Sequence, residues 1–364
     1  MIDSDPFSTS LDTPATPGRS SPRWPYVLVA VFLALGLLVL VFWPVKLPYF
    51  AMAPGPTEEV ADLVSFGEGV AVYETTGDLY LLTVTLREVN PFEWFEARYL
   101  DEKVDLLERQ VIRPPGVSDE QVRRTNLQAM NESIDTAIFV ALNRLGYEVG
   151  FIGEGVEVLQ VVAGTPADGA LEVGDRFTVI AGEMVSTFEE AGELIRTHAI
   201  GETITLEGTR AGEPLEVSIT LVEHTELPGA PMVGVVFDTV NLQMDIPIDV
   251  DVDSRNIGGP SAGMMYAIAL LDLLSEEDLT GGHRIAGTGT IRFDETVGAI
   301  GGVRQKIFAA RAIGAEIVFV PVDNYDAALT AAGNAIVIVP VATLQEALDY
   351  LRALEPVGAV AAGG

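Results

Sequence analysis

The sequence places one serine in a setting that suits nucleophilic catalysis. Ser261 follows Gly259 and Pro260 in a glycine turn, after an alternating apolar run and at the start of a strongly apolar segment with the length of a helix. A hydroxyl beside backbone N–H groups at a helix N-terminus suits acyl transfer, because those groups can stabilise an oxyanion. A serine also needs a base to remove its proton. With only three histidines in the chain, a histidine base has few candidates.

Lys306 is the alternative base. At about 100° per residue, a helix over residues 303–315 carries one apolar face, and Lys306 falls inside it. The members of that face are Val303, Ile307, Ala310, Ile313 and Gly314. A core-facing ammonium loses hydration, which lowers its pKa until a neutral amine can accept a proton. A lysine at the edge of the face would instead extend its amine to water. Periodicity alone leaves both readings open.

Residues 259–263 also fit the G-x-S-x-G turn of α/β-hydrolases, which would suggest an esterase or acyltransferase. That fold needs an acid and then a histidine after the serine. His283 is the only histidine after Ser261, and it follows too closely for the intervening strands. The residues therefore argue against a histidine triad and leave Lys306 as the candidate base, with its two possible orientations still open.

Composition excludes several classes of function. The chain has 364 residues with 53 acidic and 21 basic side chains, a net charge of −32, which repels nucleic acid. It contains no cysteine, so disulfides, thiolate catalysis and cysteine-based metal sites are excluded. We predict no cofactor, no metal and no nucleic-acid partner.

The N-terminal region reads as a membrane anchor. Residues 1–22 are rich in Ser, Thr and Pro and are predicted to form a disordered cytoplasmic tail. Residues 24–45 contain an uncharged apolar run of about 20 residues, the length of a transmembrane helix. A signal peptide cut after Ala53 is the alternative, but its apolar core is usually shorter. Arg19 and Arg23 precede the run and Lys46 follows it, which favours a cytoplasmic N-terminus and an extracytoplasmic catalytic part at the cell membrane.

The rest of the chain mixes strands and helices. Residues 77–88 alternate as a strand, and Ser118 with Gln121 forms a capping-box pattern that opens a helix ending near Gly146. Two buried strands are expected over residues 315–322 and 335–341, and a helix over 343–354. The fold class is therefore α/β or α+β.

Residues 148–225 form a different module of short alternating runs separated by Gly and Pro turns. The stretch GTPADGALEVGDRFTVIAGEMV resembles a PDZ domain of the bacterial protease type. The resemblance implies a small β-barrel that binds a peptide C-terminus or an extended segment as an added strand. We expect the groove between residues 156–162 and a helix over 188–198. The alternative is a β-rich spacer with no ligand.

The motifs GGPSAG, GTGTI and VGAIGG, with Lys306 four residues after Gly302, resemble the proteolytic domain of Lon proteases. This resemblance implies that Ser261 is the nucleophile and Lys306 the general base, with Thr288 beside them and Gly259 and Pro260 supporting the turn. Two positions depart from the family pattern: Gly258 and Thr290 stand where Lon proteases carry acidic residues. Any supporting role of those carboxylates is lost here.

The resemblance is closest to a membrane-anchored, PDZ-containing group without the ATPase module, since the chain has no G-x-x-x-x-G-K-[ST] motif. Met130, Glu132 and Ser133 fit an M-x-E-S stretch that precedes the catalytic part in Lon domains. We therefore expect one protease domain split into residues 65–147 and 226–355, with the PDZ domain inserted. Lon-like domains assemble as rings, which implies a homo-oligomer.

The sequence thus predicts an ATP-independent, membrane-anchored serine endopeptidase that cleaves unfolded or exposed segments of extracytoplasmic proteins. The PDZ domain would recruit the polypeptide substrate or gate activity. The alternative is a non-catalytic, membrane-tethered PDZ scaffold, which would have no need of a core-facing Lys306.

Overall fold

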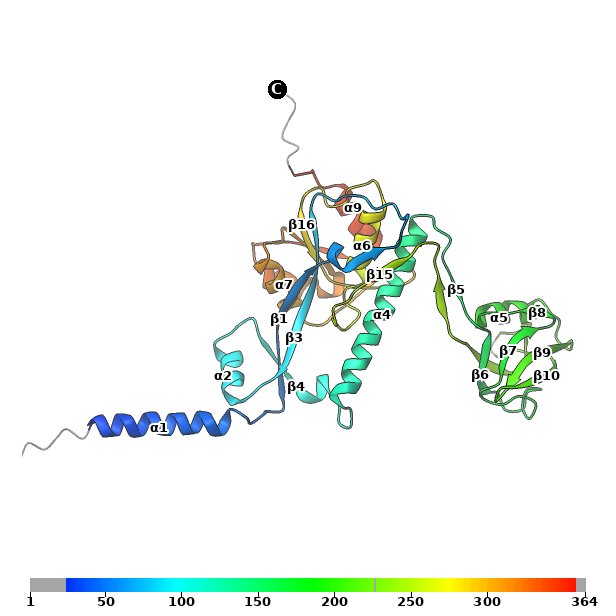
Figure 1. Ribbon diagram of the computed structural model, residues 1–364, viewed down its shortest axis with the longest axis horizontal. Coiled ribbons are helices and arrows are strands. Elements are labelled where there is room, and N and C mark those ends of the chain that lie inside the picture. Colours follow the sequence, from blue (N-terminus) through cyan, green and yellow to red (C-terminus); the bar gives the residue numbers. More distant parts are fainter. Residues whose placement is uncertain (1–23, 226, 358–364) are drawn as a thin grey trace, which may run out of the picture.

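The computed structural model describes residues 24–225 and 227–357, so the tail predicted over residues 1–22 lies outside them. A six-stranded sheet forms the centre of the larger unit, in the order β20-β19-β16-β3-β1-β4 (Figure 1). Its strands β3, β16, β19 and β20 are parallel, and β1 runs antiparallel to both β3 and β4. The bounds are β1 (Tyr49–Glu59), β3 (Asp78–Glu88), β4 (Asp105–Glu108), β16 (Arg284–Gly287), β19 (Ile317–Pro321) and β20 (Val337–Val341).

Helices cover both faces of this sheet because its strands alternate apolar side chains between two cores. Leu79 and Leu81 of β3 belong to the core that holds α4 (Asp119–Arg144), α6 (Gly263–Leu274) and α9 (Leu344–Arg352). Leu82 belongs to the opposite core, with α7 (Val303–Ala312) and α8 (Tyr325–Ala332). This layered arrangement confirms the predicted mixed α/β class.

Local sequence explains the elements that flank the site. Ser118 caps α4 with a complete capping box to Gln121, as predicted. The predicted strands near residues 77–88, 315–322 and 335–341 are β3, β19 and β20. The shorter elements are η1 (Ala61–Leu63), β2 (Val64–Phe66), α2 (Pro91–Tyr99), α3 (Arg109–Ile112), β15 (Val250–Val252), β17 (Thr290–Ile291), β18 (Val297–Gly298) and η2 (Val322–Asn324). Strand β15 pairs with β2, and β17 pairs with β18.

The smaller unit is an antiparallel barrel with its own core, centred on Phe177. Its strand order is β10-β9-β7-β6-β13, with β8 beside β7. The bounds are β6 (Val156–Val161), β7 (Arg176–Ile180), β8 (Glu183–Met184), α5 (Phe188–Arg196), β9 (Thr203–Arg210), β10 (Glu213–Thr220), β11 (Val222–Glu223), β12 (Pro231–Met232) and β13 (Val235–Thr239). The barrel sheet therefore extends past residue 225.

The sequence predicted a peptide groove between residues 156–162 and the helix over 188–198. That prediction is wrong about which strand borders the groove. Strand β6 has a neighbour on each side, β7 on one edge and β13 on the other, so it has no free edge for a peptide. Strand β13 ends the sheet and contacts α5, where the Phe188 N–H donates to Thr239 Oγ1 at 3.0 Å. The open edge beside α5 therefore belongs to β13. Sequence reasoning placed the last strand of the module before residue 225 and so missed it.

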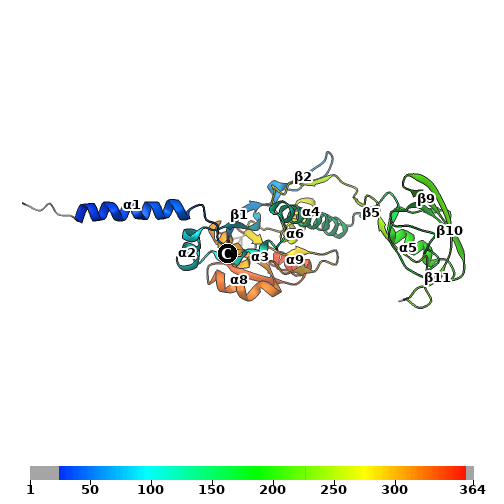
Figure 2. The same ribbon diagram turned by 90° about the horizontal axis from the view of Figure 1, so that it is seen from below.

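A two-stranded ribbon joins the barrel to the larger unit (Figures 1 and 2). It consists of β5 (Gly150–Ile152), which follows α4, and β14 (Gln243–Asp245), which leads to β15. Phe151 of β5 stacks on Phe139 of α4, and both rings meet Phe293 edge to face. These three rings fasten the ribbon to the larger unit.

Helix α1 (Trp24–Phe42) projects from the end of the larger unit opposite the barrel (Figures 1 and 2). Its 19 residues include no charged side chain, and its described large apolar side chains are exposed. No helix reaches the length and apolarity of a membrane span on its described residues alone.

Candidate active site

The turn that carries Ser261 is held from behind by α4. The Gly259 N–H donates to the Asn126 carbonyl at 2.8 Å, and Ser133 Oγ donates to the Pro260 carbonyl at 2.9 Å. Gly259 has φ +90°, a conformation that a side chain rarely adopts. Gly259 and Pro260, the two residues predicted to support the site, thus shape the turn. Among the described residues, neither forms a hydrogen bond to Lys306.

Lys306 lies on α7 with its side chain in the interior, only 2% exposed. The alternative, in which its amine extends to water, is therefore wrong. Its Nζ lies 2.6 Å from Ser261 Oγ. Burial lowers the pKa of Lys306 to about 7, and within the described residues no carboxylate forms an ion pair with it. Because desolvation disfavours the charged ammonium, a neutral amine is available near neutral pH.

Thr288 orients the side-chain amine of Lys306. Its hydroxyl donates to the Ser261 carbonyl at 3.0 Å, so its oxygen is left to accept a hydrogen bond from Lys306 Nζ at 2.8 Å. An amine that donates to Thr288 can turn its lone pair toward the hydroxyl proton of Ser261. Thr288 itself is fully buried. The structure therefore brings together the three predicted residues Ser261, Lys306 and Thr288.

Backbone donors and a cleft complete the site. Within the described residues, the N–H groups of Ser261 and Ala262 have no hydrogen-bond acceptor, and they precede the N-terminus of α6. A cleft of about 350 Å³ opens on Ser261 and Lys306. Its walls are mostly apolar and come from Pro56, Leu81, Leu82, Val84, Met130, Ile257 and Ala262, with Arg255 and Asn256 also lining it.

The two departures from the Lon pattern have a local explanation in one case. A Cβ at Gly258 would lie 2.9 Å from Asn126 Cβ, so the turn as built leaves no room for an acidic side chain there. Thr290 begins the short strand β17, and nothing in the structure explains its replacement of an acid. His283 bonds Glu316 and the Glu355 carbonyl and has no bond to Ser261, which removes the histidine of a hydrolase triad.

Sequence reasoning did not assign a role to Asn126 or Ser133. Both hold the serine turn from α4, and Ser133 is 5% exposed. A signal existed for Ser133, because it lies at helical spacing among the apolar residues Met130, Ile134 and Ala137. A buried polar side chain on an apolar helix face needs a partner, and here the partner is the turn.

Two stretches of the chain match models of known families. Residues 230–351 match the family model of the Lon protease (S16) C-terminal proteolytic domain. Residues 131–221 match that of the PDZ domain. The first match contains Ser261, Thr288 and Lys306 and omits α4, which lies before the barrel in the chain.

Individual relatives are Lon proteases. One from Mesomycoplasma hyopneumoniae is 31% identical over 32% of this chain, and Lon protease 2 from Bacillus subtilis is 34% identical over 32%. The matches cover only 13% and 19% of those proteins.

Among solved structures, the PDZ domain of an SdrC-like protein from Listeria innocua is 30% identical, with a TM-score of 0.22, over 23% of this chain and 92% of that one. The family matches and the relatives together show that this chain contains a Lon-type serine-peptidase proteolytic domain and a PDZ domain.

Proposed function

We propose that this protein is an ATP-independent serine endopeptidase that uses Ser261 and Lys306 as a catalytic dyad. The observation that carries the proposal is the 2.6 Å approach of a buried lysine amine, with a pKa lowered to about 7, to the serine hydroxyl. A non-catalytic scaffold would have no use for a buried amine, because the loss of its hydration lowers the stability of the folded protein. The absence of a G-x-x-x-x-G-K-[ST] motif from these 364 residues supports ATP independence.

The dyad acts in two stages, acylation and deacylation, and in each Lys306 takes up one proton and gives it back. Neutral Lys306 takes the hydroxyl proton of Ser261 as Oγ attacks the scissile carbonyl, and Thr288 holds the amine in place. The N–H groups of Ser261 and Ala262 stabilise the oxyanion of the tetrahedral intermediate. Lys306 then gives its proton to the departing amine, and an acyl-enzyme remains on Ser261. Water attacks that ester, with Lys306 again the base, and frees the serine.

The substrates we propose are unfolded segments, tails and loops of polypeptides. A cleft of about 350 Å³ takes an extended chain and not a folded domain. The barrel recruits such a chain by adding it as a strand to the open edge of β13, beside α5. By resemblance to Lon proteases, the catalytic units assemble as a homo-oligomeric ring.

The test uses the full chain in detergent, without ATP, with an unfolded protein as substrate and intact mass as readout. Wild type should cleave it, and Ser261→Ala and Lys306→Ala should both lose activity. Arg123→Gln, on the exposed first turns of α4, is the matched control and should cleave like wild type. Cleavage that survives in both dyad variants would refute the assignment, and no cleavage by wild type, with or without C-terminal peptides, would favour the scaffold.

We also propose that α1 anchors the protein in the cell membrane, with the N-terminus cytoplasmic and the catalytic part outside. Its 19 uncharged residues span about 28 Å at 1.5 Å per residue, close to a hydrocarbon core. Exposed apolar side chains along the whole helix need a non-aqueous neighbour.

Flotation of the full chain with liposomes tests this anchor. Wild type should float, and Leu35→Arg should float less, since a charge at the centre of a span costs about 3 kcal/mol. A wild-type protein that stays at the bottom of the gradient would refute the anchor and leave the peptidase proposal intact.

A further inference from the structure

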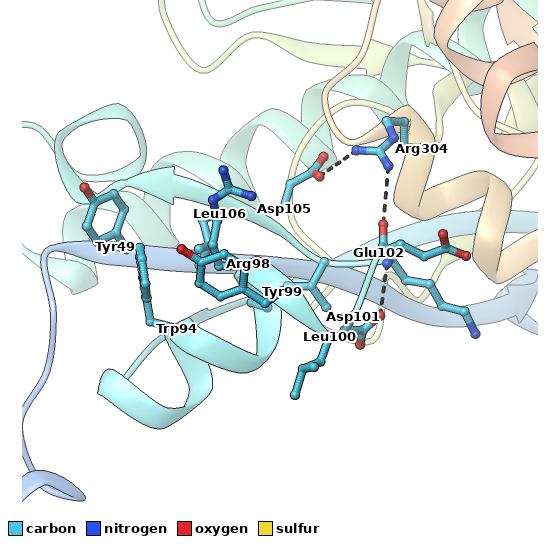
Figure 3. A pocket seen from close by; sticks show the side chains of 13 residues that line it. Tyr49, Trp94, Arg98, Tyr99, Leu100, Asp101, Glu102, Asp105, Leu106 and Arg304 are labelled. Atoms are coloured by element: carbon cyan, nitrogen blue, oxygen red, sulfur yellow. Dashed lines mark hydrogen bonds and ion pairs between the residues drawn. The ribbon is translucent and has the colours of Figure 1, made fainter.

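A hollow of about 940 Å³ lies between α2, the loop before β4 and the first turn of α7 (Figure 3). It does not include Ser261 or Lys306. Aromatic rings of Tyr49, Trp94 and Tyr99 line it together with charges of both signs. Three of the lining residues are basic and three acidic: Arg98, Lys103, Arg304, Asp101, Glu102 and Asp105. In a chain of net charge −32, this local balance is unusual and does not repel an anion.

Among the described residues, one guanidinium in this hollow has no carboxylate partner. The Arg98 guanidinium forms no ion pair within the same residues, whereas Arg304 is already bonded to Asp105 at 2.7 Å. A guanidinium is suited to a phosphate.

The aromatic rings supply a second recognition element. The Arg98 guanidinium lies 5.4 Å from the centroid of the Tyr99 ring, so one face of that ring is covered by Arg98 and holds the guanidinium in place. Trp94 lies 6.3 Å from Tyr49 and 6.3 Å from Tyr99, centroid to centroid. Ring faces with nearby carboxylates, here those of Asp101 and Glu102, are the surroundings that bind an ammonium group.

The hollow adjoins the end of α1. The Leu47 N–H donates to the Val89 carbonyl at 2.8 Å, which ties the chain after α1 to the residues that open α2. Figure 1 shows α2 beside the end of α1. Phe95 and Leu100, at 53% and 74% exposure, project from this region. Aromatic and apolar side chains beside a span are typical of the membrane–water interface.

We propose that this hollow binds the headgroup of a zwitterionic phospholipid. Arg98 holds the phosphate, and the rings with Asp101 and Glu102 hold the ammonium. The balanced charge favours a zwitterion over an anionic headgroup. The inference rests on the proposed anchor only in that the anchor brings a lipid to the site.

A ligand bound in the hollow would also affect α7, the helix that carries Lys306. Arg304 lines the hollow, and the next residue, Gln305, donates from Nε2 to the Lys103 carbonyl at 3.3 Å. Lys306 follows directly on α7. A headgroup that orders the loop over residues 101–105 therefore also steadies the turn that precedes the catalytic amine.

Native mass spectrometry of the full chain tests the proposal. The protein is released from detergent doped with phosphatidylethanolamine, or with diacylglycerol, which has the same chains and no headgroup. We expect retention of phosphatidylethanolamine over diacylglycerol. Arg98→Gln and Glu102→Gln should each weaken retention about tenfold, the loss of one charge-assisted hydrogen bond. Arg98 is exposed, so its variant should fold, and Arg123→Gln on α4 is the matched control.

Soluble phosphoethanolamine separates this inference from the anchor, because its binding needs no bilayer. Competition by phosphoethanolamine, lost in Arg98→Gln, would support the headgroup site even if the protein failed to float with liposomes. Equal retention by the two site variants and the control would overturn the proposal. So would equal retention of diacylglycerol, or displacement by inorganic phosphate as effective as by phosphoethanolamine.

Discussion

At the scale of single residues, the site depends on one buried amine. Lys306 meets no carboxylate among the described residues, so its lowered pKa has desolvation as its cause. The burial that lets the amine act as a base also lowers the free energy of unfolding at low pH. The reason is that the folded protein binds the Lys306 proton less tightly than the unfolded chain does. Activity and stability should therefore respond to pH through the same group.

The pH dependence of activity is the first prediction. Since Lys306 must be neutral to accept the serine proton, kcat/KM should rise with pH about tenfold per unit below pH 7 and level off above it. Peptide cleavage between pH 5 and 9 measures this. A flat profile across pH 7 would contradict a lysine base, and a His283→Gln variant should keep the wild-type profile.

The second prediction concerns stability. Between pH 7 and 10.5 the unfolded chain holds the Lys306 proton and the folded one does not, so the free energy of unfolding rises with pH. Relative to Lys306→Met, wild type should gain about 2–3 kcal/mol from pH 6 to pH 9. Denaturant unfolding of both proteins at the two pH values measures it. A difference that does not change with pH would show that the amine titrates normally.

At the scale of elements, α4 supports the turn that carries Ser261. Ser133→Ala removes the donor to the Pro260 carbonyl, so we expect a loss of about 1 kcal/mol in stability and a fall in kcat with little change in KM. Thr136→Ala, on the same helix with a hydroxyl bonded only to the Glu132 carbonyl, is the matched control and should keep the wild-type kcat. Equal kinetics for the two variants would remove α4 from the positioning of Ser261.

Strand β13 gives the fourth prediction. If a peptide is added at the open edge of the barrel, amide exchange should slow in β13 on binding and stay unchanged in β6, whose edges are already paired. Hydrogen exchange of the full-length Ser261→Ala protein with C-terminal peptides measures this. Slowing in β6 alone would restore the groove expected from the sequence.

Periodicity and capping predicted most of the elements around the site. The capping box at Ser118, the alternation of β3 and the apolar face around Lys306 each reflect local rules, and each element formed where expected. Other features depend on distant pairing. Strand β1 contains Pro54, Gly55 and Pro56, which read as a turn, yet a bulge accommodates them beside β3. The Asn126 carbonyl that holds the serine turn has no sequence signature, because any residue supplies a carbonyl.

At the scale of the whole molecule, three aromatic rings set the position of the ribbon. Phe151→Ala should leave the dyad and the barrel folded but loosen their connection, so proteinase K should cut the ribbon of the Ser261→Ala protein faster. Ile152→Ala is the control, since this neighbour is 50% exposed and makes no ring contact. Equal cutting of both variants would mean that the rings do not fasten the ribbon.

The same ribbon bears on how such a chain arises in evolution. The chain leaves the larger unit through β5 and returns through β14, and these strands pair Gly150 with Asp245 and Ile152 with Gln243. The entry and exit of the barrel are thus neighbours, as in a hairpin closed by two residues. One insertion of DNA between the codons for β5 and those for β14 would add the whole barrel and leave the pairing of the six-stranded sheet unchanged, and one deletion would remove it. A peptide-recognition module can therefore be acquired or lost in a single genetic step.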